Sequence, residues 1–136
     1  MGVEQHLERL RAVTAGCSLA AFGDLRTRLV LRVSADGDWP QERLDTLCVE
    51  AAESFRTADG IALRDAGLSD PENKVREAVI LGVQEIRVYV RSDIDPNDMI
   101  CCVCQSAQDV PKLTAASPAV CPAPDSRLTG VASTDP

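Results

Sequence analysis

Apolar residues recur at helical spacing in two stretches of the chain. Near the N-terminus, Val3, Leu7 and Leu10 lie on one face, which predicts a helix over residues 3–15 that ends at Gly16. The strongest periodic signal comes later and predicts a helix over residues 40–57. Its apolar members are Leu44, Leu47, Cys48, Ala51, Ala52 and Phe55.

Two runs between these helices have the pattern of strands. Residues 17–23 are small and apolar, as in a strand buried on both faces, and residues 27–34 alternate between apolar and polar. In the second run we expect Leu29, Leu31 and Val33 to point the same way, into the core. A short turn joins the two runs, so they are predicted to form a hairpin.

Three more strands are predicted after the second helix, over residues 78–81, 85–91 and 99–105. The middle run alternates strictly, so Ile86, Val88 and Val90 are expected to face inward. Two interpretations are open for Arg87, Tyr89 and Arg91 on its outward face. They bind a partner peptide or an anion, or they are covered by the N-terminal helix or the C-terminal segment, with the aliphatic parts of the arginine side chains packed flat. The second of these interpretations is favoured.

The remaining segments are predicted to be less regular. Residues 58–74 contain Asp59-Gly60, Gly67 and Asp70-Pro71 and are interpreted as a loop, or a loop with a short helix over residues 61–66. A weak helix is expected over residues 109–116. Residues 117–136 are rich in proline and are predicted to be a disordered tail.

This order of elements predicts an α+β fold: a five-stranded antiparallel sheet with helices packed on it, mainly on one face. Residues 1–116 would form a single domain and residues 117–136 the tail. At 136 residues, the chain is long enough for one hydrophobic core.

Composition and charge exclude several classes of protein. The net charge is −7 and the chain has no cluster of lysine and arginine, which argues against nucleic-acid binding. The longest apolar run, residues 78–83, is far shorter than the roughly 20 residues of a membrane-spanning helix. Residues 1–11 are charged and periodic, unlike a signal peptide, so a cytoplasmic protein is expected.

The six cysteines raise the possibility of thiol or metal chemistry. The run Cys101-Cys102-x-Cys104 is the strongest candidate, for a thiol- or metal-dependent enzyme or sensor. On a strand, however, Cys102 and Cys104 share one face while Cys101 takes the other, so three thiols do not converge easily on one ion. We therefore expect cysteine to serve as a small hydrophobic residue here, with no cofactor and no metal.

Two other candidate sites are weak. Asp93, Asp95 and Asp98 cluster in one turn but lack the pattern of a calcium-binding loop, so a solvated turn is expected. His6, the single histidine, lies in the N-terminal helix rather than beside a cysteine, which argues against a cysteine–histidine hydrolase.

The order of elements resembles the roadblock / dynein-light-chain family, whose architecture is related to that of profilin-like domains. The resemblance covers roughly residues 3–116. It rests on the hairpin LAAFGDLRTRLVL at residues 19–31, on the helix at 41–57, and on the strands at 87–91 and 100–104. It implies a non-enzymatic dimeric scaffold or regulatory protein-binding module, often a regulator of small GTPases.

In that family the long middle helices of two subunits pack together and the third strands pair edge to edge. Transferred to this chain, the resemblance implies a homodimer interface. Its residues are Leu44, Leu47, Cys48, Ala51, Phe55, Ala78, Val79, Ile80 and Leu81.

The residues themselves support the dimer independently. An apolar strand at 78–81 on the edge of a sheet is an aggregation hazard unless it is paired, and pairing with its own copy removes the hazard. Two alternatives stay open: a monomer in which helix 40–57 packs on its own sheet, and a ligand-sensing module with a pocket between the sheet and residues 58–74.

Overall fold

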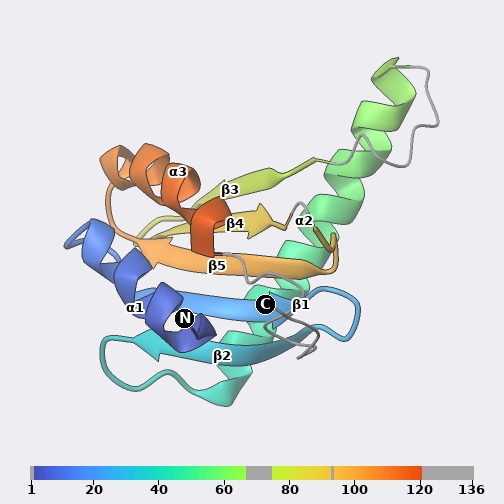
Figure 1. Ribbon diagram of the computed structural model, residues 1–136. Helices are drawn as coiled ribbons and strands as arrows, with labels where there is room; N and C mark the ends of the chain where they lie inside the picture. The colour runs from blue at the N-terminus through green and yellow to red at the C-terminus, as the bar shows by residue number, and fades with distance from the viewer. Residues whose placement is uncertain (1, 67–74, 93, 121–136) are drawn as a thin grey trace, which may run out of the picture.

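The computed structural model describes residues 2–66, 75–92 and 94–120, with residues 62–66 and 117–120 described as backbone only. Over these ranges it contains five strands and three α-helices around a single sheet (Figure 1). In chain order the elements are α1 Val3–Val13, β1 Leu19–Asp24, β2 Leu29–Ala35, α2 Gln41–Ala66, β3 Glu77–Leu81, β4 Ile86–Arg91, β5 Asp98–Cys104, the short 3₁₀-helix η1 Ala107–Asp109, and α3 Val110–Val120.

The predicted fold class is confirmed. The strands form one antiparallel sheet in the order β2-β1-β5-β4-β3, so the hairpin and the meander are joined through β1 and β5. We expected the helices to lie mainly on one face of the sheet, but they lie on both. Figure 1 shows α1 and α3 on the near face of the sheet and α2 behind it, and this leaves the two outer strands β2 and β3 as the open edges.

Each face of the sheet therefore has its own hydrophobic core. The core beneath α1 and α3 is formed by Leu7, Leu10, Cys17, Ala20, Phe22, Ile86, Val88, Val90, Ile100, Cys102, Cys104 and Leu113. The core beneath α2 is formed by Leu19, Ala21, Leu44, Leu47, Cys48, Ala51, Phe55, Tyr89, Met99, Cys101 and Val103. The continuous apolar run of β5 supplies both cores, as expected of a central strand.

The second core corrects one prediction about β4. We favoured a covered face for Arg87, Tyr89 and Arg91, with the N-terminal helix or the C-terminal segment as the cover. The face is covered, but by α2, and Tyr89 is fully buried. The alternation itself was interpreted correctly, since Val88 and Val90 point into the opposite core. Tyr89 and Arg91 are buried and Arg87 is half-buried, because Glu50 and Asp59 of α2 supply partners for them.

The prediction for β2 was wrong as well. Its side chains do not alternate regularly because the pairing with β1 shifts between Phe22 and Gly23, which leaves Leu31 as an extra residue in a β-bulge. Instead of facing the core together, Leu29, Leu31 and Val33 are all exposed. A bulge of this kind cannot be recognised from a hydrophobic pattern, because the pattern assumes a strict period of two.

Both helices that follow the hairpin are longer than predicted. α2 continues through Asp59-Gly60 to Ala66, so the first nine residues of the predicted loop at 58–74 are helical, and residues 67–74 lie outside the described residues. Its C-terminal part projects beyond the sheet in Figure 1. α3 ends at Val120, past the predicted domain boundary at residue 116, while the predicted tail from residue 121 lies outside the described residues.

We expect Phe55→Ala to lower the free energy of unfolding by about 3–5 kcal/mol, because Phe55 is 1% exposed and its removal leaves a cavity between α2 and the sheet. Urea denaturation measures the change. Val49→Ala on the same helix is the matched control, since Val49 is 39% exposed, and it should shift stability by only about 0.5 kcal/mol. Similar losses in both variants would contradict the placement of α2.

Candidate functional site

The open edge at β3 is the candidate functional site. Among the described residues, this strand pairs with β4 alone, over five consecutive residues without a bulge. From Ala78 to Leu81 it carries no charge. A regular apolar edge strand presents a row of backbone N–H and C=O groups that another strand can pair with.

The side chains of β3 are divided between its two faces. Ala78 and Ile80 point toward α2 and pack against the core beneath that helix. Val79 lies opposite Val88, so it points to the other face of the sheet, where it is 39% exposed. Leu81 is 73% exposed. Exposure of aliphatic residues on a free edge is typical of a surface that binds protein.

An open groove of about 490 Å³ runs between β3 and the C-terminal half of α2. We call it the α2–β3 groove. It is lined by Glu53, Ser54, Thr57, Ala58, Ile61, Glu77, Ala78, Val79 and Ile80. Small residues on the helix side leave room for another element, and Ile61 is 45% exposed beside them.

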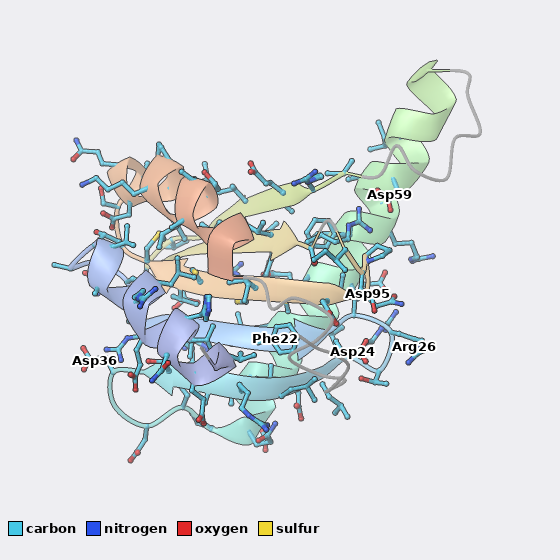
Figure 2. All side chains as sticks on the ribbon, in the orientation of Figure 1. Phe22, Asp24, Arg26, Asp36, Asp59 and Asp95 are labelled. Carbon is cyan, nitrogen blue, oxygen red and sulfur yellow. The ribbon has the colours of Figure 1, made fainter. Side chains whose placement is uncertain are left out.

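An ion pair between half-buried Asp59 and buried Arg91 fixes the start of β3 against α2. Asp59 accepts hydrogen bonds from the Arg91 guanidinium, at 3.0 Å to Nη1 and 2.7 Å to Nη2, and from the Val75 amide at 2.9 Å. Arg91 also donates from Nε to the Val75 carbonyl at 2.8 Å, and its guanidinium lies 4.4 Å from the centre of the Phe55 ring. Figure 2 shows Asp59 where α2 leaves the sheet. Asp59 and Arg91 therefore position the edge strand.

A second polar network lies between α2 and β4, toward the opposite end of β4 from Arg91. Glu50 accepts from Arg87 at 2.5 Å (Nε) and 3.1 Å (Nη2), and from the Tyr89 hydroxyl at 2.5 Å. Burial raises the pKa of Tyr89 well above its usual range, so Tyr89 stays neutral and donates. Arg43 joins the network through Glu85 and lies over the Trp39 ring. These contacts hold α2 to β4 and leave β3 free.

The structure separates the predicted interface residues into two groups. The strand residues lie on the open edge, as described above. The helix residues Leu44, Leu47, Cys48, Ala51 and Phe55 are all at most 7% exposed and pack on the chain's own sheet, so a second copy cannot contact them directly. The apolar stripe was recognised correctly, but its function is to form the core.

Sequence analysis missed the helix side of the groove. Ser54, Ala58 and Ile61 lie at i, i+4 and i+7, which continues the helical period past residue 57. That signal was given less weight than Asp59-Gly60, a pair typical of turns. Glycine within a helix costs about 1 kcal/mol, and the contacts of Asp59 with Arg91 and Val75 offset that cost.

The cysteines do not form a catalytic or metal-binding arrangement in the described part of the chain. Cys102 and Cys104 face the core beneath α1 and α3 while Cys101 faces the core beneath α2. No group of three or more His, Cys, Asp or Glu side chains among the described residues is placed to hold a metal ion. Burial raises the pKa of Cys48 and of Cys104 to about 11.

Two of the thiols interact with each other. The neighbouring Cys102 thiol lowers the pKa of Cys17, and the Cys17 thiol raises that of Cys102. Cys17 is nevertheless only 5% exposed, so reagents in solution do not reach it readily. Of the three predicted turn aspartates, Asp98 is buried and Asp95 accepts a hydrogen bond from the Asn97 amide in its own turn, at 3.0 Å. Residue 93 lies outside the described residues.

Comparison with known proteins shows the fold. No protein-family model and no curated sequence matches the chain. Among solved structures it is similar to a roadblock/LC7 domain from Streptomyces avermitilis, with a TM-score of 0.70 and 11% identity over 88% of this chain and 92% of that one. The gliding protein MglB from Thermus thermophilus follows, with a TM-score of 0.64 and 16% identity over 88% and 87%.

MglC from Myxococcus xanthus is similar as well, with a TM-score of 0.60 and 11% identity over 88% of this chain and 97% of that one. At these identities the likeness shows the fold alone. The chain has the roadblock/LC7 fold, as its order of elements suggested. No helix within the described residues is both long and apolar enough to cross a membrane.

We expect Asp59→Asn to destabilise the protein by about 3 kcal/mol, because it leaves the buried Arg91 guanidinium without its counter-charge. Urea denaturation followed by circular dichroism measures the loss. Glu53→Gln removes the partner of two exposed arginines and should leave the unfolding midpoint almost unchanged. Equal shifts in the two variants would show that Asp59 does not hold β3.

The thiols give a second prediction. At pH 8 the buried cysteines should react with a thiol reagent about 100-fold more slowly in the native protein than in denaturant, because most stay protonated and all must wait for local opening. Spectroscopic titration with Ellman's reagent measures the rates. Cys121→Ser is included because residue 121 lies outside the described residues. Fast native labelling of Cys101, Cys102 and Cys104 would favour the enzyme or sensor hypothesis.

Proposed function

We propose that the protein is a non-enzymatic regulatory scaffold that acts as a homodimer through β3 and the α2–β3 groove. The observation that carries the proposal is the open, regular and apolar edge at β3. Pairing β3 with the same strand of a second copy would extend the sheet across a two-fold axis, and such an interface is self-complementary.

The two edges of the sheet differ in a way that supports this choice. At β2 the bulge at Leu31 interrupts the regular ladder, and Arg32 places a charge in the middle of the strand. Bulges and charges are the devices by which sheets prevent edge-to-edge association. β3 has neither between Ala78 and Leu81. A second copy therefore fits β3 better than β2.

The groove suggests which part of the second copy would lie beside the paired strands. Two-fold pairing of β3 brings the partner's α2 close to this α2, on the same face of the extended sheet. The helix residues that would meet it are those lining the groove, Ser54, Thr57, Ala58 and Ile61, rather than the buried stripe. This replaces the helix half of the interface that the resemblance implied.

The partner class is also proposed from the resemblance. Roadblock-like proteins often regulate small GTPases, so a small GTPase is the first partner to test with the purified dimer. Co-elution that depends on whether GDP or a GTP analogue is bound would support regulation. Equal binding of the GDP and GTP-analogue forms would support a scaffold that does not regulate the GTPase.

We expect the protein to be a dimer in solution and Val79→Lys to weaken the dimer about 100-fold, because each of two copies loses about 1.4 kcal/mol at the paired edge. Size-exclusion chromatography with light scattering, over a range of concentrations, measures the mass. Val33→Lys is the matched control on the β2 edge: Val33 is 40% exposed and Val79 39%, yet the control should stay dimeric. A constant mass of 14.6 kDa for the unmodified protein would refute the dimer.

A further inference from the structure

The opposite edge of the sheet carries a second exposed apolar surface that the dimer does not use. On β2, Leu29 is 50% exposed, Leu31 45% and Val33 40%. In the described part of the chain β2 pairs with β1 alone, so along its outer side the N–H and C=O groups of alternate residues point away from the sheet. Figure 1 shows β2 and β3 at opposite ends of the sheet.

A groove accompanies this edge too. It has a volume of about 490 Å³ and passes over β2 between the first turns of α1 and α2. The lining residues are Glu4, Val30, Leu31, Arg32, Val33, Gln41 and Leu44. Because Leu31 is the extra residue of the bulge, the aliphatic side chains of β2 line the rim of the groove instead of the core.

The charge of this edge is opposite to that of the whole chain. The chain has a net charge of −7, but residues 25–35, which Asp24 and Asp36 flank, contain Arg26, Arg28 and Arg32 and no acidic residue. Arg28 pairs with Glu53 at 3.0 Å. Within the described part of the chain, Arg26 and Arg32 form no ion pair, and Arg32 donates only to the Leu31 carbonyl at 2.8 Å. Figure 2 shows Arg26 pointing into solvent at the end of the β1–β2 hairpin.

Other elements add to this positive character. The groove is bordered by the N-terminal turns of α1 and α2, through Glu4 and Gln41. Helix N-termini carry a partial positive charge, which Glu4 and Glu42 in these first turns partly offset. Among the described residues that line the groove, Glu4 is the one acidic side chain. The electrostatics of this edge therefore favour an anionic occupant.

We propose that β2 binds an extended, acidic segment of a partner protein by strand addition. The segment's backbone pairs with the free side of β2 over the regular stretch Arg32–Ala35, beyond the bulge at Leu31. Its apolar residues contact Leu31 and Val33, and its carboxylates pair with Arg32 and Arg26. A second copy of this chain is a poor occupant, since it would bring arginines against arginines. The site lies apart from β3, so the inference does not depend on the dimer.

The test uses the full-length protein and a fluorescein-labelled peptide, (Val-Glu)4, whose binding is followed by fluorescence anisotropy at low salt. An acidic peptide is a stringent probe because the net charge of the protein repels it. We expect saturable binding that Arg32→Glu weakens at least about tenfold. Arg56→Glu, which makes the same change of charge on exposed α2, should weaken it less than about twofold.

Further measurements determine whether the peptide adds as a strand. The same peptide N-methylated at every residue has no backbone N–H to donate to β2 and should bind at least about tenfold more weakly. Amide chemical shifts should change over residues 29–35 and not over residues 77–81. Absence of saturable binding, equal binding by Arg32→Glu, or equal binding of the N-methylated peptide would overturn the inference. The Val79→Lys variant should bind the peptide with unchanged affinity. The peptide-binding proposal and the dimer proposal can therefore be refuted independently.

Discussion

The packing of α2 across one face of the sheet is the interaction on which the rest of the structure depends. Five apolar residues of α2, from Leu44 to Phe55, are buried against β1, β4 and β5, and Glu50 and Asp59 hold the helix to β4. Because α1 and α3 cover the other face, both faces of the sheet are covered by helices of the same chain. Association with other proteins is therefore left to the edges and to the exposed side of α2.

The two edges are built differently, and the difference follows from a few residues. β3 is regular and uncharged between Ala78 and Leu81, and Asp59 with Arg91 fixes its start against α2. β2 is bulged at Leu31 and carries Arg32 in a chain with a net charge of −7. In our account the first edge suits a second copy of the chain and the second an acidic strand, so one sheet would serve two kinds of association.

Much of this fold could be predicted from the sequence, because the strict alternation at residues 86–90 and the helical stripe from Leu44 to Phe55 are strong local signals. What could not be predicted depends on distant contacts. The helix continues through Gly60 because Asp59 meets Arg91, 32 positions away, and Tyr89 is buried because Glu50 accepts its hydroxyl. The interface residues stay a prediction for the same reason: an apolar stripe does not reveal whether it will pack on its own sheet or on another chain, and here the stripe packs on its own sheet.

Amide hydrogen exchange along β3, measured at high and at low protein concentration, tests the central claim most directly. If a second copy pairs with this edge, the outward N–H groups of residues 77–81 become hydrogen-bonded, and their exchange should slow markedly as the concentration rises, while residues 29–35 stay unchanged. Exchange along β3 that is fast and independent of concentration, or protection that develops at β2 instead, would contradict the account.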